Sequence, residues 1–418
     1  MSAAPARGGK RLRPIPSQTT PPRAGAGRIF LYRARTARHN PDVAYLSVDK
    51  LQNMLASEVF GYAKDKKKAS GRALGTLVEI VSYYTLCSWG LRDCIAIESR
   101  VPEFANPEIT HNVEFSLHPI ASSRSIALKP LHLPITSKKL LRAAGPPQAG
   151  WTTRDECLVS TSRVMRNAAM IAERDGGFLT THLTDIDATG CTVAVNDLLD
   201  APFAIFECKR VGVEEGMKKG PQTIEKAKQG AYVARSVSSL QKFRLGNGKV
   251  QGVLDVGDGH LRTGDYSALL RQVIDGADKD MLRHFIVTVG VVSNHGNWFT
   301  AENHNKELKV LAHSYDWLIF LTDNGLCQFI EKLLLNPIDE LKPAREAFLA
   351  SYSGTSGKNC FTKTKIRVDA DQALKRYFEL HEPEVESWFN VIAPRGCTLK
   401  ELRRDLVKLA RKPWKEIR

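Results

Sequence analysis

The sequence predicts an α/β fold in which helices flank one central mixed sheet, with insertions and a helical C-terminal region. Three observations lead to this prediction. Strand-like and helix-like segments alternate between residues 73 and 335, as they do in α/β cores. The segment FAIFECKRV (203–211) is apolar on both faces, as a strand in the middle of a sheet is. The 418 residues also suffice for a large core and for two or three domains.

The first predicted elements are a helix and two strands. The helix covers residues 73–90 and is apolar all round, which indicates a buried helix. It carries one acid, Glu79, and a buried glutamate needs a hydrogen-bonding partner, a cation or a metal. Residues 94–99 and 111–119 are predicted strands, the second with alternating apolar and polar character.

The middle of the chain continues the alternation of helices and strands. Residues 163–177 are a predicted helix closed by paired glycines, and 178–190 are a strand that runs to a turn. A charged helix follows over 222–243, and the glycine-rich stretch 252–265 is a predicted flexible loop. Two apolar strands and a helix complete the core, at 284–293, 316–323 and 325–335.

Both ends of the chain are basic. Residues 1–40 contain nine Lys or Arg and no acid, so we expect a flexible arm that either contacts DNA or has no such role. The region from about 340 is predicted to be helical. Its last helix opens with a capping box formed by Thr398 and Glu401, and it is either a solvated amphipathic helix or a DNA-facing one.

The overall charge points to a polyanionic partner. Lys and Arg outnumber Asp and Glu by 60 to 45, which gives a net charge of +15. Nucleic acid is the leading partner class, although acidic membranes and acidic proteins stay open. No apolar run reaches membrane-spanning length and no signal peptide is apparent, so we expect a cytoplasmic protein. Eight cysteines without a CxxC pair are expected to be core residues, not a zinc site or a disulfide framework.

The strongest functional signal lies in the central strand. Because side chains alternate along a strand, Glu207 and Lys209 emerge side by side on one face. An ion pair buried for its attraction alone rarely stabilises a protein, so we expect a site that uses both groups. Hydrolysis of a phosphodiester needs oxygen ligands for Mg²⁺ and a group that acts on water. Asp185 and Asp187, on one face of the preceding strand, are the candidate second carboxylates.

These residues resemble the PD-(D/E)XK nucleases, whose pattern is an acidic helix, an Asp ending one strand and (D/E)xK on the next. Glu207-Cys208-Lys209 matches the last element, and Asp187 matches the preceding Asp. Glu79 is similar to the helix acid of the family, and Gln229 to a glutamine that some members place beside the site.

Two departures from the family pattern stand beside this resemblance. No proline precedes Asp187, and the long gap after the Glu79 helix leaves Glu156 and Glu173 as alternative acids for the metal shell.

The resemblance implies a restriction-endonuclease-like core and a Mg²⁺-dependent endonuclease of the type II restriction kind. Asp187, Glu207 and Glu79 would bind the metal, and Lys209 would position the water. The implied partners are double-stranded DNA, a second copy in a homodimer and a companion DNA methyltransferase. A structure-specific repair or recombination nuclease and a non-catalytic DNA-binding protein are the alternatives. No histidine pairing, P-loop or Rossmann fingerprint offers a competing site.

The same interpretation divides the chain into three parts. Residues 1–40 form the basic arm, residues 41–335 the nuclease core, and residues 336–418 the basic helical region. Within the core, insertions at about 100–175 and 245–280 are expected to supply arms that enter the DNA grooves.

Overall fold

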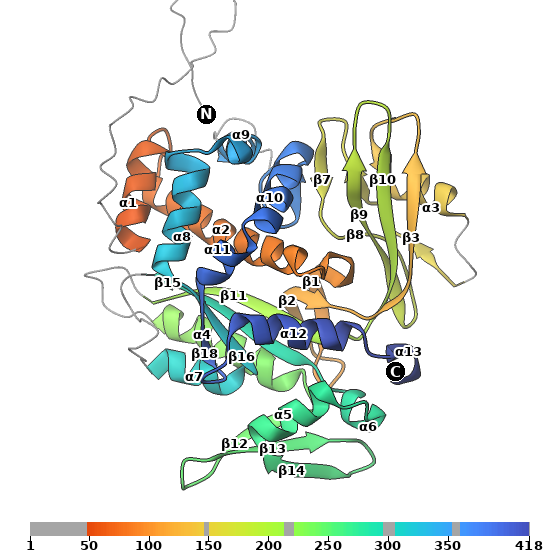
Figure 1. Ribbon diagram of the computed structural model, residues 1–418, viewed down its shortest axis with the longest axis vertical. Helices are drawn as coiled ribbons and strands as arrows, with labels where there is room; N and C mark the ends of the chain where they lie inside the picture. The colour runs from red at the N-terminus through yellow and green to blue at the C-terminus, as the bar shows by residue number, and fades with distance from the viewer. Residues whose placement is uncertain (1–47, 146–149, 213–220, 296–305, 353–359, 418) are drawn as a thin grey trace, which may run out of the picture. The chain divides into compact units, whose positions relative to one another are not determined.

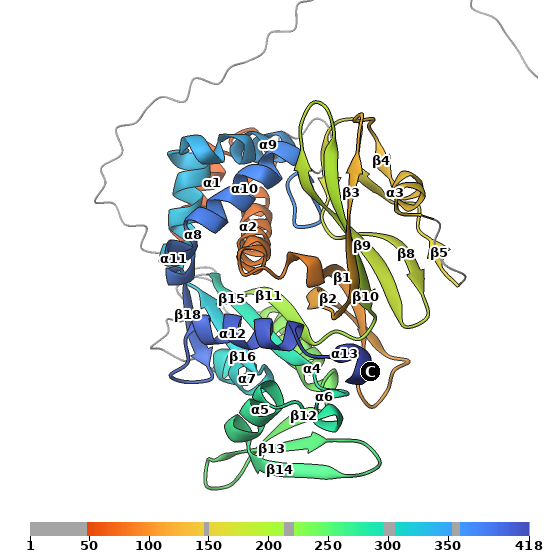
Figure 2. The same ribbon diagram turned by 45° about the vertical axis from the view of Figure 1, so that its right-hand side comes forward.

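A six-stranded mixed sheet lies at the centre of the fold (Figures 1 and 2). The computed structural model describes residues 48–145, 150–212, 221–295, 306–352 and 360–417, so the predicted arm 1–40 lies outside the described residues. The strand order is β1-β2-β11-β15-β16-β18. The strands are β1 (Ile95–Pro102), β2 (Thr110–Leu117), β11 (Ala204–Gly212), β15 (Val287–His295), β16 (Trp317–Leu321) and β18 (Phe389–Ala393).

Strand β11 is central, as predicted. It pairs antiparallel with β2 on one side and parallel with β15 on the other. Successive residues of β11 face opposite layers. Arg210 donates a hydrogen bond to the carbonyl of Gly71 in the helix α2 (Lys66–Ser88), at 3.2 Å. Val211 packs with Ala231 in the helix α4 (Pro221–Ser236) on the other face. The predicted α/β fold with a mixed sheet between helices is confirmed.

A second sheet is inserted between β2 and β11. It is antiparallel in the order β3-β10-β9-β8-β5. Its strands are β3 (Ile120–Leu128), β5 (Thr152–Thr153), β8 (Ala169–Arg174), β9 (Gly177–Ile186) and β10 (Cys191–Leu199). A four-stranded sheet adjoins it in the chain, made of β4 (Ile135–Thr136), β6 (Cys157–Val159), β7 (Val164–Arg166) and β17 (Lys365–Arg367), with α3 (Ser137–Ala144). The inserted strands therefore span 120–199 and not 100–175, because β1 and β2 belong to the central sheet.

The helix predicted over 163–177 is wrong, since β7 and β8 occupy this segment. Ala168 has a positive φ of 47° at the turn between the two strands. Strand β8 is held by its pairing with β9, and Ile171 and Ala172 are buried there. Small apolar residues in the sequence fit helical spacing as well as strand spacing, and the tertiary pairing decides between them.

A three-stranded sheet follows α4 and corrects two further boundaries. The strands are β12 (Leu240–Arg244), β13 (Val250–Asp255) and β14 (Leu261–Asp265), with α5 (Tyr266–Asp275) packed against them and α6 (Lys279–Leu282) after it. The helix predicted over 222–243 thus ends at Ser236. The predicted loop 252–265 is a hairpin, in which Gly257 and Gly259 adopt positive φ at the turn.

The remaining elements are mostly helical. They are α1 (Val48–Glu58), α7 (Lys306–Ser314), α8 (Asp323–Ile330), η2 (Glu331–Leu335), η3 (Asp339–Leu341), α9 (Lys342–Tyr352), α10 (Val368–Leu380), α11 (Glu382–Ser387), α12 (Leu399–Ala410) and α13 (Trp414–Ile417), with the short η1 (Arg92–Cys94) before β1. The helical C-terminal region is confirmed, yet it also supplies the edge strand β18. Buried Asp371 of α10 accepts hydrogen bonds from Tyr84 of α2 at 2.7 Å and from Arg92 at 3.1 Å.

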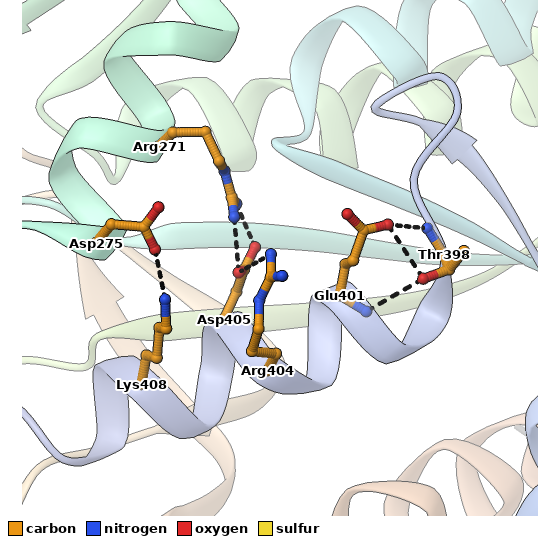
Figure 3. Close-up of polar contacts among 7 residues, drawn as sticks. All are labelled: Arg271, Asp275, Thr398, Glu401, Arg404, Asp405 and Lys408. Atoms are coloured by element: carbon orange, nitrogen blue, oxygen red, sulfur yellow. Dashed lines mark hydrogen bonds and ion pairs between the residues drawn. The ribbon is translucent and has the colours of Figure 1, made fainter.

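Helix α12 is attached to α5 by charged contacts (Figure 3). The predicted capping box of Thr398 and Glu401 is confirmed. The buried Asp405 carboxylate accepts hydrogen bonds from Arg271 of α5, and Lys408 pairs with Asp275 of α5 at 2.8 Å. This amphipathic helix packs on the fold through one face, because its four apolar-face leucines are buried: Leu399, Leu402, Leu406 and Leu409.

Two further observations concern the cysteines and the length of the helices. All eight cysteines are free, and six of them are buried. In the part of the chain that the structure describes, no helix is both long and apolar enough to cross a membrane.

We expect Arg271→Ala to lower the free energy of unfolding by about 3 kcal/mol, because it leaves the buried carboxylate of Asp405 without its main cation. Lys408→Ala, which breaks the exposed pair of the same interface, should cost only about 0.5 kcal/mol. Urea denaturation of both variants measures the difference. Equal losses in the two variants would contradict the importance of the buried pair.

Candidate functional site

Glu207 and Lys209 form an ion pair on the α4 side of β11. The Lys209 Nζ lies 2.9 Å from the Glu207 Oε2, and the two side chains are 38% and 5% exposed. The other carboxylate oxygen, Glu207 Oε1, is buried without a hydrogen-bond partner among the described residues. A buried oxygen left without a donor is costly, and a water or a cation bound at this position would lower that cost.

The strand register brings two more glutamates to the same level of the sheet. Strands β2 and β11 pair as far as Phe115 and Phe206, so Glu114 and Glu207 are the next residues of the two strands, just beyond the end of the ladder. Strands β1 and β2 have a register that sets Glu98 opposite Glu114, and Glu98 has a positive φ of 53° there. Like charges on adjacent strands destabilise a sheet. This row of carboxylates therefore requires cations.

Lys363 is one of these cations, and it comes from the segment before β17. Its Nζ lies 3.5 Å from the Oε2 of Glu79 on α2 and 3.3 Å from the Oε1 of Glu98. It also contacts the carboxylate of Glu114. Burial raises the pKa of Glu79, and the positive charges of Lys363 and Lys209 oppose this rise. Glu79 is therefore close to both lysines.

Helix α4 borders the site on its other side. Glu207 and Lys209 line a cavity of about 520 Å³ together with His111 of β2 and Gln229 and Tyr232 of α4. Glycine at residue 230 lets α4 pack closely against Tyr315, because a Cβ there would lie 2.7 Å from the Oη of Tyr315. The predicted neighbour Gln229 thus lies beside the Glu-x-Lys pair.

Asp187 is not at this site, which corrects the sequence-based expectation. It follows β9 in the turn before β10, where its Oδ1 accepts hydrogen bonds from Thr189 and Gly190. These bonds lower the pKa of Asp187. The turn adjoins Leu128, at the end of β3 that is about 26 Å along the strand from the end next to β2.

The other alternative acids also belong to the insertion. Asp185 lies at the end of β9 and pairs across the sheet with Thr192. Glu156 forms an ion pair with Arg166 at 2.9 Å, and Glu173 forms one with Arg154. Neither of these glutamates is on a helix, so of the three candidate helix acids the structure brings only Glu79 to the lysines of the site.

Sequence reasoning missed Glu114, Glu98 and Lys363. Glu114 had a usable signal, because it is an acid flanked by apolar residues in the predicted strand 111–119. The insertion of 120–199 separates Glu114 from Glu207 in the sequence, so spacing along the chain does not connect the two residues. Lys363 carries no local signal, since it reaches the site only through the packing of the C-terminal region.

The donors fit Mg²⁺ in type. Among the described residues, no group of three or more His, Cys, Asp or Glu side chains is placed to hold a metal ion. Mg²⁺ does not need such a group, because it commonly binds through one or two carboxylates, several waters and substrate phosphates. Glu207, with its buried free oxygen at a cavity, supplies one such carboxylate.

Comparison with known proteins identifies no relative: no family model, no curated protein and no solved structure matches the chain.

We expect Lys363→Met to lower the free energy of unfolding by about 2 kcal/mol at pH 7.5, because three carboxylates lose a shared cation. The loss should shrink at pH 5. Without Lys363 the pKa of Glu79 rises further above its ordinary value, and protonation of such a group favours the folded state. Urea denaturation of wild type and variant at the two pH values measures this loss of unfolding free energy. Lys365→Met, which changes an exposed lysine two residues on, is the control and should have little effect.

Proposed function

We propose that this protein is a Mg²⁺-dependent DNA endonuclease with a restriction-endonuclease-like core of the PD-(D/E)XK kind. The observation that carries the proposal is the Glu-x-Lys pair of β11, in which Glu207 and Lys209 line a cavity where β2 and β11 stop pairing. Glu114 follows the last paired residue of β2, and we propose it as the second carboxylate.

The order of the elements supports the same proposal. An acidic helix, α2 with Glu79, precedes an acidic strand, β2 with Glu114, and then the Glu-x-Lys strand β11. This order resembles the family pattern, with Glu114 in the position that the sequence suggested for Asp187. A glutamate keeps the carboxylate ligand and lengthens its reach by one carbon.

The charges of the site favour one divalent ion. Glu79, Glu98, Glu114 and Glu207 carry four negative charges, and Lys209, Lys228 and Lys363 carry three positive ones. The formal net charge is therefore −1. Glu114 and Glu207 would hold the ion, and Glu79 and Glu98 would stay with Lys363. When bound, Mg²⁺ would neutralise this charge and offset the negative charge of the scissile phosphate.

Lys209 and Gln229 are the groups that would act on the water and the phosphate. The Lys209 ammonium is half exposed to the cavity while its pairing with Glu207 fixes its position. It would hold the attacking water and stabilise negative charge that develops on the phosphate. The Gln229 amide lines the same cavity and would orient a phosphate oxygen or a water.

The substrate we propose is double-stranded DNA, cut at specific sites as a type II restriction enzyme does. The net charge of +15 supports a polyanionic substrate. We also propose a homodimer, since two copies related by a twofold axis suit both strands of a palindrome, and a companion methyltransferase that protects the same site.

We expect Mg²⁺-dependent cleavage of phage DNA into discrete fragments. Glu207→Gln and Glu114→Gln should each lower the rate at least about 100-fold, because each removes charge that offsets the transition state. Asp187→Asn should cleave as the wild type does. Sequencing of the fragment ends would give the recognition site. Loss of cleavage in Asp187→Asn but not in Glu114→Gln would refute the assignment of the second carboxylate.

Divalent ions should bind once per chain. Titration calorimetry with Ca²⁺, used as a probe that does not require turnover, should give a stoichiometry of one, because one divalent ion is enough to offset the negative charge of the site. Glu207→Gln should weaken this binding at least about tenfold, since it removes a charged ligand. Asp187→Asn should leave it unchanged. Two equivalent ions per chain would contradict the charge balance.

A further inference from the structure

A basic pocket lies on the C-terminal side of α4, outside the candidate active site. Its volume is about 760 Å³, within the range of ligand-binding pockets. Five cationic side chains line it, from four parts of the chain: Arg235, Lys242, Arg244, Lys309 and Arg395. Concave sites that collect one sign of charge focus the electrostatic potential.

The carboxylate of Asp316 opposes the lowering of the Lys242 pKa, but it does not form an ion pair with that lysine. Within the described parts of the chain, none of the five forms an ion pair with a carboxylate. The acid in the lining, Asp316, is already engaged, since it accepts hydrogen bonds from Thr288 at 2.8 Å and from Tyr266. Unpaired cations gathered from several elements repel one another, and an anionic ligand relieves that repulsion.

The pocket also has one rigid cation at its base. The Lys242 ammonium donates to the carbonyl of Tyr315 and lies 4.5 Å from the ring centre of Tyr266. Burial lowers the pKa of Lys242 to about 8. Burial also lowers the pKa of His313 in the same lining, and Arg235, Lys242 and Arg244 add to this effect. The positive charges therefore act on one another across the pocket.

We propose that this pocket binds backbone phosphates of the DNA that occupies the candidate active site, an inference that rests on the proposed function. Helix α4 connects the two places: Gln229 and Tyr232 line the active-site cavity, and Arg235 lines the basic pocket. Six helical residues span about 9 Å, a distance that a few nucleotides of one DNA strand cover. One strand can therefore contact both.

Lys309→Ala combined with Arg395→Ala tests the proposal, because both side chains are exposed and the fold should tolerate their loss. Binding of a labelled duplex is followed by fluorescence anisotropy at several salt concentrations without divalent ions. The slope of log affinity against log salt should fall by about 2, and affinity at 0.1 M salt roughly tenfold. The control removes the same charge elsewhere, with Lys138→Ala and Lys415→Ala on α3 and α13.

If the pocket variant binds DNA as the control does, the proposal is overturned. ATP titrated into wild type and variant distinguishes a free phosphorylated ligand: loss of ATP binding with unchanged DNA affinity would also overturn it. The outcome is separable from the nuclease activity. A protein that fails to cut DNA but loses affinity in the pocket variant retains the pocket and loses the proposed function. If the wild type cuts DNA but the pocket variant binds DNA normally, the proposed function stands and the pocket proposal fails.

Discussion

The register between β2 and β11 is the constraint on which the site depends. The pairing of Phe115 with Phe206 is the last of this ladder and places Glu114 and Glu207 next to its end, and a shift by one residue would exchange the faces of the β2 side chains. The apolar residues on both faces of β11 hold that register, because each face packs against a different helix. A row of carboxylates at the end of this ladder is unfavourable for the sheet alone. Lys209 and Lys363, which come from two distant parts of the chain, offset the repulsion between these carboxylates.

Those lysines explain why the C-terminal region cannot be treated as an appendage. It contributes the edge strand β18 and the Lys363 ammonium that contacts Glu79, Glu98 and Glu114. Asp371 fastens the same region to α2 through Tyr84 and Arg92. The helix that carries Glu79 is thus positioned by C-terminal contacts, and changes in residues 360–380 should be considered together with the site.

The two cavities that α4 borders differ in their charged side chains. One is lined by the buried carboxylate of Glu207 together with Lys209 and Lys228, and the unpartnered oxygen of Glu207 suits a cation. The other gathers cations without carboxylate ion pairs in the described structure, which suits phosphates. The proposed nuclease would use both, because it must hold a metal at one phosphodiester and the neighbouring phosphates of a polyanion.

Local patterns in the sequence determined the central strand with Glu207 and Lys209, the helix with Glu79, the helix with Gln229 and the capping box of Thr398. These features follow from periodicity and spacing within about 20 residues. The second carboxylate, the cation Lys363 and the basic pocket were decided by tertiary structure alone. The insertion of 120–199 separates β2 from β11 in the chain while the sheet keeps them adjacent. Sequence distance therefore pointed to Asp187, whereas strand pairing brings the end of β2, and Glu114 with it, to the level of Glu207. This is possible because hydrogen bonds between strands do not depend on the length of the chain that joins them.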